Sequence, residues 1–434
     1  MNTMSMTKRS ELGEGAPMLA IVGGGAAGLM AAIHAARMGA SVTVFERNER
    51  CARKLGITGK GRCNLTNHCT RDVFFANVTG DARFLYSAWS RFDSAATEAF
   101  FEELGVPLKV ERGNRVFPVS DKARDVVDAL VRAAHREGVE IHYARVERIL
   151  EKDGRVCGLV AGGREYAANA VILATGGASY PLTGSTGDGY AFARALGHRI
   201  VPPTPSLVPL VEDGQFCASV QGLSLRNVRL SARDTQTGKT LFEEQGELLF
   251  THFGLTGPLV LSASAHLVPM QPQRYELSID LKPALDEKTL DARLLSDFAK
   301  YANRDFANAL GDLLPQKLIE PLVRRSGIDP HKKVHTVTKE ERHRLLSLLK
   351  GLTVPVKGTR PIAEAIITKG GVALGEVMPR TMESKRVRGL YFAGELLDLD
   401  AYTGGFNLQI AFSTAVVAGE SAAIAVQSEP DGTF

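Results

Sequence analysis

Near the start of the chain, an apolar run, a glycine-rich turn and an alanine-rich helical pattern follow one another. Residues 18–22 are continuously apolar and predict a buried strand. Residues 26–38 predict a helix that Gly39 ends, and residues 41–45 predict a second strand. This order predicts a parallel strand–helix–strand unit, because parallel neighbours need a crossover connection.

The middle of the chain carries further helical and strand patterns. The expected elements are helices over 81–104 and 121–137 and strands over 140–150, 155–161 and 170–175. Asp153-Gly154 is the expected hairpin turn, and the last apolar run is typical of a parallel strand buried on both faces. Four prolines between 202 and 209 indicate a linker.

Similar strand patterns at both ends of the chain indicate one discontinuous α/β nucleotide-binding domain. Thr338 and Glu341 have the spacing of a capping box, and Gly351 is the expected end of that helix. The later expected elements are strands up to about 281, a helical block over 286–349, strand-like sequence over 352–377, a buried strand over 389–394 and a helix from 404 to 425. The predicted segments are a flexible tail (1–16), a nucleotide-binding domain in two parts (17–200 and 378–434), a β-rich insertion in two parts (201–285 and 351–377) and a helical subdomain (286–350).

Composition is that of a globular protein, with 44% hydrophobic and 23% charged residues. The apolar stretch 18–33 follows Lys8 and Arg9, as in a secretion signal, but Glu11 and Glu14 interrupt the preceding region. No other run approaches the length of a membrane span. The five cysteines show neither a disulfide framework nor zinc-ligand spacing, so we expect a cytoplasmic protein with no metal site and no membrane partner.

Positive charge is concentrated in one segment. The net charge of the chain is +4, whereas the segment from Lys317 to Lys350 contains nine Lys and Arg against four acidic residues. Two interpretations stay open: a solvated helical face, or a patch that binds a polyanion such as RNA.

The turn after the first strand has the spacing of a dinucleotide-binding signature. Gly23 permits the tight turn, Gly25 lets the backbone approach a pyrophosphate, and Gly28 lets the helix pack closely on the strand. The N-terminus of the helix adds free N–H groups and a positive dipole end. Glu46 follows the second strand, where it can accept hydrogen bonds from ribose hydroxyls. The complete strand–helix–strand context favours nucleotide binding over a plain turn.

Three glycine-containing strand ends, at Gly23, Gly176 and Gly394, predict FAD rather than a smaller nucleotide. Open parallel sheets bind ligands at the carboxyl ends of their strands, and a long basic loop over 47–70 adds further donors. The helix after Gly405 would direct its positive end at the flavin. The other expected contacts are Arg53 and Lys54 with the pyrophosphate, Gly59, Gly61 and Asn64 with the ribityl chain or flavin, Val146 with the adenine, and Asp398 with a ribityl hydroxyl.

Several longer motifs resemble those of the BaiN/YhiN-like flavoproteins, also called the aminoacetone-oxidase-like family. The most extended is the signature loop over 55–67, Leu-Gly-Ile-Thr-Gly-Lys-Gly-Arg-Cys-Asn-Leu-Thr-Asn. The other matching motifs cover 175–181, 184–189, 251–258, 394–398 and 402–407, and the resemblance extends from 18 to 425. It implies a discontinuous Rossmann-like FAD-binding domain with an inserted β-barrel-like domain and a small helical domain.

The resemblance also implies FAD contacts at Ala27, Arg47 and Ile410. Thr58 stands where the family usually has serine, and both residues offer a hydroxyl. The full set of expected cofactor-binding residues is Gly23, Gly25, Ala27, Gly28, Glu46, Arg47, Arg53, Lys54, Gly59, Gly61, Asn64, Val146, Gly176, Gly394, Asp398, Asn407 and Ile410.

Cys63 is the candidate catalytic residue, because the neighbouring Arg62 would favour its thiolate. The alternative is that its side chain packs beneath the flavin while its backbone binds. His252 is a candidate proton donor and, equally, a candidate structural histidine.

The resemblance implies three chemistries: reduction of carbonyl-conjugated C=C bonds in steroid-like acids, reduction of a uridine in large-subunit ribosomal RNA, and oxidation of small amino ketones. The first two are one reaction class, in which hydride goes to the carbon β to a carbonyl and an acid protonates the α carbon. We therefore expect an FAD-dependent ene reductase. RNA uridine is the leading substrate, because binding to RNA would explain the concentration of cations over 317–350. NAD(P)H is expected to donate electrons transiently, since no second GxGxxG motif is present. An amino-ketone oxidase and a non-catalytic FAD-binding, RNA-associated protein remain alternatives.

Overall fold

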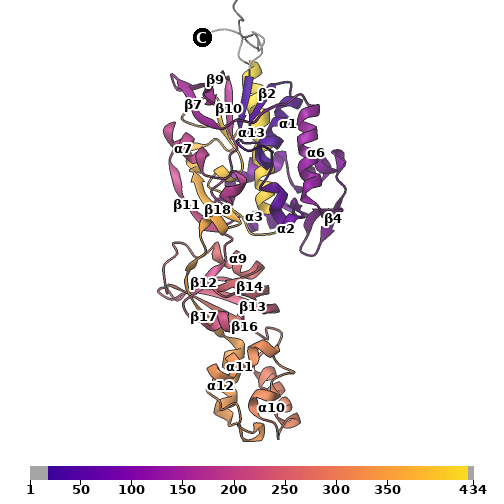
Figure 1. The fold of residues 1–434 in the computed structure, drawn as a ribbon, viewed down its shortest axis with the longest axis vertical. Helices are drawn as coiled ribbons and strands as arrows, with labels where there is room; N and C mark the ends of the chain where they lie inside the picture. The colour runs from indigo at the N-terminus through magenta and orange to yellow at the C-terminus, as the bar shows by residue number, and fades with distance from the viewer. Residues whose placement is uncertain (1–17, 429–434) are drawn as a thin grey trace, which may run out of the picture. The chain divides into compact units, whose positions relative to one another are not determined.

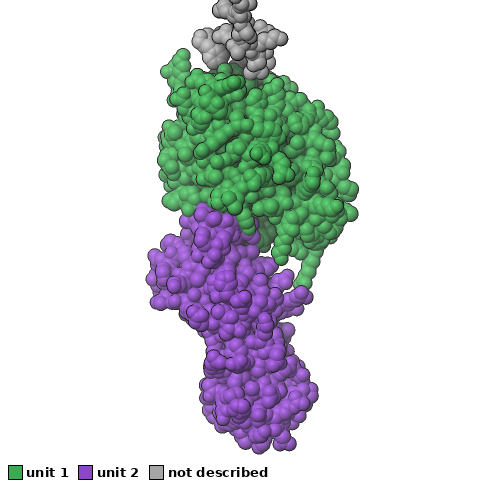
Figure 2. Space-filling model, in the orientation of Figure 1, with its two compact units in different colours: residues 1–203, 369–434 green, residues 204–368 purple. Residues whose placement is uncertain are grey.

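The chain forms two compact units. The computed structural model describes residues 18–428, so the tail expected over 1–16 lies outside the described residues. One unit is built from Met1–Pro203 and Lys369–Phe434, and the other from Thr204–Thr368 (Figure 2). The second unit is therefore an insertion in the first. The first unit resumes at Lys369, whereas the sequence pattern places this change at 378.

A parallel five-stranded sheet forms the centre of the first unit (Figure 1). Its order is β19-β10-β1-β2-β6, and all neighbouring strands are parallel. The strands are β1 (Met18–Val22), β2 (Ser41–Phe45), β6 (Glu140–His142), β10 (Ala170–Leu173) and β19 (Leu390–Phe392). Leu19, Ile21 and Ile172 are completely buried, which explains the continuous apolar runs of β1 and β10. This strand order is that of a Rossmann-type sheet, as predicted.

Two helices from opposite ends of the chain pack together in this unit. α1 (Ala26–Arg37) connects β1 to β2, and α13 (Phe406–Ser428) contacts α1, β1, β10 and β19. A Cβ atom at Gly419 would lie 2.4 Å from the Ala31 carbonyl oxygen, so glycine permits this close contact. By length and composition α13 could cross a membrane, contrary to the sequence-based expectation, but 72% of its most apolar window is buried inside the protein. Its burial is that of a core helix.

Smaller elements surround the parallel sheet. β3, β5 and β4 form one antiparallel sheet, and β7, β8 and β9 form another. The helices are α2 (Thr58–Gly61), α3 (Arg71–Ala76), α4 (Tyr86–Arg91), α5 (Ser94–Glu103), α6 (Ala123–Arg136) and α7 (Asp188–Ala195). The strands are β3 (Thr66–Asn67), β4 (Leu108–Glu111), β5 (Arg115–Pro118), β7 (Val146–Lys152), β8 (Arg155–Ala161) and β9 (Arg164–Ala167).

Two expected elements of this unit are each divided in the structure. The prediction of a single strand over 140–150 is wrong, because β6 joins the parallel sheet and residues 143–145 lead the chain into β7. The helix predicted over 81–104 is interrupted before α5, where the Asp93 side chain accepts a hydrogen bond from the N–H of Ala96. The hairpin turn at Asp153-Gly154 is confirmed by the pairing of Lys152 with Arg155.

The second unit combines a closed six-stranded barrel with helices. The barrel order is β12-β15-β14-β13-β16-β17, which confirms the barrel-like insertion. Its strands are β12 (Leu210–Glu212), β13 (Ser224–Asp234), β14 (Thr240–Phe250), β15 (Gly254–Thr256), β16 (Tyr275–Asp280) and β17 (Leu352–Thr359). The helices are α8 (Phe216–Ser219), α9 (Pro258–Ser264), α10 (Glu287–Lys300), α11 (Gln316–Ser326) and α12 (Lys339–Lys350). Both hydrogen bonds of the predicted capping box are present at the start of α12, and Gly351 is its C-cap.

Two strands carry the chain between the units. β11 (Ile200–Ser206) and β18 (Ile367–Val372) form a two-stranded sheet. The chain passes from the first unit to the second within the predicted proline linker. Residues 200–206 form a strand there, because each strand of a two-stranded sheet has a free edge where proline removes no ladder hydrogen bond. The strand-like sequence over 352–377 is likewise divided between β17 and β18 by a short turn at Ile362–Glu364.

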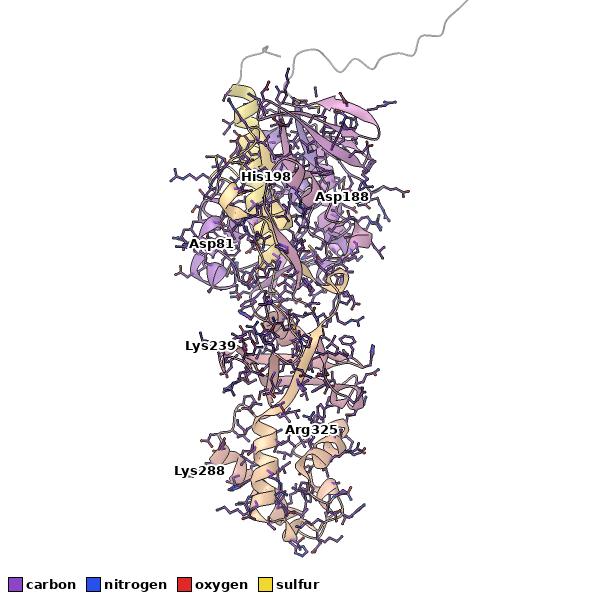
Figure 3. The ribbon with its side chains drawn as sticks, turned by 90° about the vertical axis from the view of Figure 1, so that its left-hand side faces the viewer. Asp81, Asp188, His198, Lys239, Lys288 and Arg325 are labelled. Atoms are coloured by element: carbon purple, nitrogen blue, oxygen red, sulfur yellow. The ribbon has the colours of Figure 1, made fainter. Side chains whose placement is uncertain are left out.

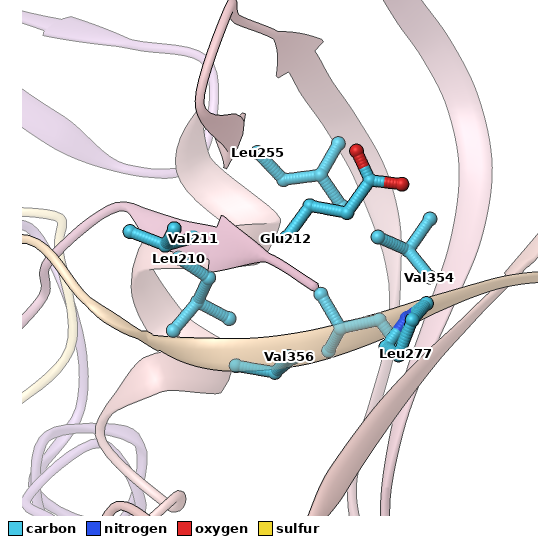
Figure 4. Close-up of a pocket in the computed structure, with 8 residues that line it drawn as sticks. Leu210, Val211, Glu212, Leu255, Leu277, Val354 and Val356 are labelled. Carbon is cyan, nitrogen blue, oxygen red and sulfur yellow. The ribbon is translucent and has the colours of Figure 1, made fainter. Parts of the chain in front are cut away.

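The barrel of the second unit offers little room for a ligand (Figure 4). The space among Leu210, Val211, Leu255, Leu277, Val354, Pro355 and Val356 is too small to hold a water molecule. Pockets for small organic ligands are usually about 300–1,000 Å³. The one carboxylate beside it, Glu212, already accepts hydrogen bonds from the N–H groups of Phe216 and Cys217 at 3.1 and 2.7 Å. This space is therefore too small for a dinucleotide.

Candidate functional site

The three glycine-containing strand ends meet at one edge of the parallel sheet. β1, β10 and β19 are neighbours with the same direction, so the turns that follow them lie together. A Cβ atom at Gly23 would lie 2.6 Å from the Ala174 carbonyl oxygen, and one at Gly394 would lie 2.9 Å from the Cβ of Ala27. Gly176, two residues beyond Ala174, has a φ of 72°. The convergence predicted from the sequence is therefore present.

The turn after β1 has the geometry of a phosphate-binding loop. Gly23 has a φ of 104°, and a Cβ atom at Gly28 would lie 1.8 Å from the Gly23 carbonyl oxygen. A Cβ atom at Gly25 would have no neighbour within 4 Å, so the space in front of this residue is open. No side chain caps the N-terminus of α1. An anionic group can therefore reach the free N–H groups there.

Glu46 lies at the end of β2 beside this turn. It is only 6% exposed, and its carboxylate accepts hydrogen bonds from the N–H of Gly24 at 2.9 Å and from the N–H and Nδ2 of Asn48 at 2.7 and 2.6 Å. Asn48 also binds the Thr183 carbonyl and the Arg53 guanidinium at 3.1 and 3.0 Å. A carboxylate has about four acceptor sites, so capacity for a ribose hydroxyl remains. The sequence did not predict Asn48 as a site residue, because Asn48 belongs to no recognisable motif.

Two of the cations expected to contact FAD, Arg47 and Lys54, already have partners. Arg47 binds Asp188 at 3.0 Å, and Asp188 also binds Arg145 at 3.1 Å (Figure 3 labels Asp188). Lys54 places its Nζ 2.6 Å from a carboxylate oxygen of Glu395 and 2.7 Å from the Ser179 hydroxyl. These ion pairs and hydrogen bonds do not support the predicted contacts of Arg47 and Lys54 with FAD, which therefore stay predictions.

Lys54, Ser179 and Glu395 link three loops at the edge of the sheet. Ser179 follows β10, Glu395 follows β19, and Lys54 comes from the loop after β2. The Ser179 hydroxyl is 3.1 Å from the second carboxylate oxygen of Glu395, and the Lys54 and Glu395 side chains are 21% and 13% exposed. Glu395 lies in the motif over 394–398, but the sequence does not predict that its carboxylate binds the distant Lys54.

The signature loop contains an unusual backbone turn. Gly59, Lys60 and Gly61 all have left-handed backbone conformations, with φ of 57°, 59° and 82°. Asn64 follows. When its side-chain amide is oriented so that both its nitrogen and its oxygen have hydrogen-bond partners, the oxygen accepts a hydrogen bond from the N–H of Gly405 at 3.0 Å. A Cβ atom at Gly405 would lie 2.3 Å from the backbone of Thr66. The signature loop is therefore fixed against the start of α13.

The remaining expected cofactor residues have varied surroundings. Asn407 accepts from the N–H of Ala401 at 2.9 Å and donates to its carbonyl at 2.7 Å, so it fixes the loop before α13. Burial and the nearby Asp400 raise the pKa of Asp398 above its usual range. Val146 and Ile410 are 5% and 3% exposed. These contacts with FAD remain predictions.

Cys63 is a buried thiol, and no cation among the described residues pairs with it. It is 0% exposed, and burial raises its pKa to about 12, an effect that a hydrogen bond with Thr58 partly opposes. The guanidinium of Arg62 binds Glu111 and Asp121 instead. Because a thiolate is the nucleophilic form of cysteine, these surroundings favour the packing role over catalysis. His252 is exposed in the second unit, with its ring 5.1 Å from that of Phe253.

The cations between Lys317 and Lys350, which belong to the helical block, are largely bound by residues of their own unit. Five of them bind carboxylates: Arg324 to Glu320, Lys332 to Glu341, Lys333 to Asp305, Arg342 to Asp291 and Lys350 to Asp280. Three donate to carbonyl oxygens: Lys317 to Gln221, Arg325 (labelled in Figure 3) to Thr353 and Arg344 to Ser326. Within residues 18–428, only Lys339 of these nine makes neither kind of contact. The solvated-face interpretation is therefore favoured.

The fold and the phosphate-binding turn define a Rossmann-type dinucleotide-binding protein. The sequence matches the HI0933-like protein Rossmann domain over residues 17–421, and the chain belongs to this family. The match confirms the flavoprotein resemblance of its motifs.

Two kinds of relatives are similar over nearly the whole chain. The chain is 33% identical over 413 residues to a 3-dehydro-bile acid delta(4,6)-reductase of Clostridium scindens, covering 93% of this chain and 98% of the relative. It is 31% identical over 403 residues to a ribosomal RNA dihydrouridine synthase of Haemophilus influenzae, covering 91% and 96%. The solved quinol fumarate reductase FrdA of E. coli shares the fold, with a TM-score of 0.51 at 20% identity, covering 96% of this chain and 71% of that one.

Family and relatives make this chain an FAD-dependent oxidoreductase. The site fits the cofactor, because the space before Gly25 is open, the N-terminus of α1 is uncapped and the Glu46 carboxylate lies beside this turn with acceptor capacity left. The first unit supplies these features from β1, α1 and β2.

Proposed function

We propose that the protein reduces a C=C bond conjugated to a carbonyl group, with NAD(P)H as electron donor and a uridine of ribosomal RNA as the leading substrate. The observation that supports this most is the near full-length similarity to relatives with two names that describe one reaction class. A dihydrouridine synthase saturates the C5=C6 bond of uracil, which is conjugated to a carbonyl. A delta(4,6)-reductase of a 3-dehydro-bile acid acts on double bonds conjugated to the 3-oxo group.

FAD, when bound, would supply the hydride for the carbon β to the carbonyl. The residues of the chain would hold and orient the reactants. The turn from Gly23 to Gly28 and the start of α1 would bind the pyrophosphate, and Glu46 would accept from the ribose. The Lys54–Ser179–Glu395 contacts would keep the three surrounding loops in place. The positive end of α13 would favour negative charge near the signature loop.

A steroid-like enone is the second candidate substrate, favoured by the 33% identity to the bile acid reductase. An RNA substrate would require the protein to act in the cytoplasm. The lack of a disulfide framework among the cysteines agrees with that compartment. The two candidates share the chemistry and differ in the size and charge of the substrate, so a direct comparison can separate them.

Anaerobic titration tests the proposal. NADH or NADPH should remove the visible absorbance of the bound flavin, and an unmodified ribosomal RNA transcript should then restore it and gain dihydrouridine, measured by mass spectrometry. A 3-oxo-4-ene steroid serves as the parallel substrate. Reoxidation by the steroid alone would support the second candidate. Loss of absorbance with aminoacetone instead of nicotinamide would contradict the reductase proposal.

A further inference from the structure

A second cation-rich region lies in the first unit, on the signature loop and the β4–β5 hairpin. Residues 58–68 and 108–125 together contain seven Lys and Arg and three acidic residues. Two of the carboxylates, Glu111 and Asp121, are occupied by Arg62 and Lys109. The positive excess of this region is therefore carried by the other side chains.

Four cations of this region make no ion pair with any described residue: Lys60, Arg112, Arg115 and Lys122. All four are exposed. Arg115 donates to the Arg112 carbonyl at 3.0 Å, and its guanidinium lies 5.7 Å from the centre of the Phe117 ring, so it is oriented without being neutralised. We call these four residues the hairpin surface.

The two segments that carry the hairpin surface contact each other directly. Arg62 of the signature loop binds Glu111 of β4 and lies over the Phe117 ring of β5 at 4.2 Å. A Cβ atom at Gly59 would lie 3.3 Å from the same ring. α2 and β5 both contact α6, and Figure 1 shows α2, β4 and α6 on the same side of this unit. The four cations therefore belong to one continuous part of the first unit.

Lys60 occupies a position that would suit glycine better. It stands between two glycines with a φ of 59°, and a left-handed non-glycine residue costs about 1 kcal/mol. The side chain is exposed, and no ion pair with a described residue offsets this cost. Backbone strain of this kind concentrates at functional sites. The strained lysine is adjacent in sequence to Gly59 and Gly61, which are expected to contact the ribityl chain or flavin.

We propose that the hairpin surface binds the phosphate backbone of an RNA and holds it next to the signature loop. A cation without a carboxylate partner can pair with a phosphate at once, whereas the ion-paired cations of the helical block must first leave their own carboxylates. Four such cations on two segments suit an extended polyanion. The inference rests on the proposed function, because it names the surface that would hold the RNA substrate.

A matched pair of charge variants tests this inference. The hairpin variant combines Lys60→Gln, Arg112→Gln, Arg115→Gln and Lys122→Gln. The control combines Arg324→Gln, Lys332→Gln, Lys333→Gln and Arg342→Gln, which removes the same charge from ion-paired positions of the helical block. Binding of an unmodified ribosomal RNA transcript is measured over a salt series, and FAD content is measured in parallel. The hairpin variant should reduce the slope of log Kd against log salt concentration by about 3, while the control keeps the wild-type slope.

The outcomes separate the inference from the function on which it rests. A steep wild-type slope that the hairpin variant retains would overturn the inference and leave the proposed function standing. A slope lost only in the helical-block control would also overturn it. Wild-type protein without salt-dependent RNA binding would contradict both. Should the hairpin variant lose its FAD, the double variant Arg112→Gln and Lys122→Gln carries the same test with a slope change of about 1.5.

Discussion

The helical block and the hairpin surface have a similar excess of positive charge but differ in what their cations contact. Five cations of the segment 317–350 bind carboxylates, and three of these carboxylates lie outside that segment: Asp280, Asp291 and Asp305. At the hairpin surface, the four cations bind no carboxylate of residues 18–428. Charge counted along a sequence window therefore does not measure the charge available to a ligand, because the fold brings in partners from other segments.

The largest expected effect concerns the ion pair between Lys350 and Asp280. Lys350 lies 2.6 Å from the carboxylate of Asp280, which is 9% exposed, and also donates to the Leu285 carbonyl at 2.7 Å. Lys350→Met should lower the free energy of unfolding by about 3 kcal/mol, because it leaves a buried carboxylate unpaired. Urea unfolding followed by circular dichroism measures this change.

The matched control for this prediction is Lys60→Met. Lys60 is exposed and makes no ion pair with a described residue, so the free energy of unfolding should stay within about 0.5 kcal/mol of wild type. Similar losses in both variants would show that the two cation-rich regions do not differ in the way their contacts indicate.

The sequence predicts the elements whose cause is local or periodic. The turn at Gly23–Gly28, the buried strands β1 and β10, the capping box at Thr338 and the barrel-like insertion are all present. Glycine spacing and apolar runs encode these features directly, and the barrel came from the resemblance of longer motifs. The division of 140–150 into β6 and β7 depends on which sheet each half joins, which no local pattern records.

The candidate site shows the same limit. The sequence places Glu46 and the three glycine-containing strand ends, because each follows an apolar strand. It does not reveal that Lys54 binds Glu395, 341 positions away, or that Asn64 binds the start of α13. For Cys63 the sequence left catalysis and packing as alternatives, and only the structure shows that the side chain is buried. Long-range partners of charged and polar side chains are decided by the tertiary fold.

An effect of intermediate size is expected at Glu341, whose carboxylate binds two different groups of the helical block. Glu341 accepts from Lys332 and from the N–H of Thr338, and these contacts lower its pKa, with Lys332 the larger cause. The stabilisation is therefore present above the unfolded-state pKa of about 4.3 and is lost as the pH falls below it. Glu341→Gln should lose about 1 kcal/mol at pH 7 and show a flatter decline of stability between about pH 5 and pH 3.

Urea unfolding over a pH series measures this prediction. Glu320→Gln is the control, because Glu320 pairs with Arg324 while both side chains remain about 80% exposed, and such pairs contribute little. A Glu341→Gln variant whose stability declines with acid as steeply as wild type would contradict the assignment of Glu341 as a structural carboxylate.

The smallest expected effect is an increase in stability at the hairpin surface. Lys60→Gly removes the left-handed penalty of about 1 kcal/mol and adds about 0.5 kcal/mol of unfolded-state freedom, so the free energy of unfolding should rise by about 0.5 kcal/mol. RNA affinity should fall in the same variant, because one unpaired cation is lost. Lys60→Asn is the control: asparagine tolerates the left-handed conformation and carries no charge, so it should show the same loss of affinity. A loss of stability in both variants would show that the Lys60 side chain supports the fold, and Lys60 would then belong with the structural cations of the helical block.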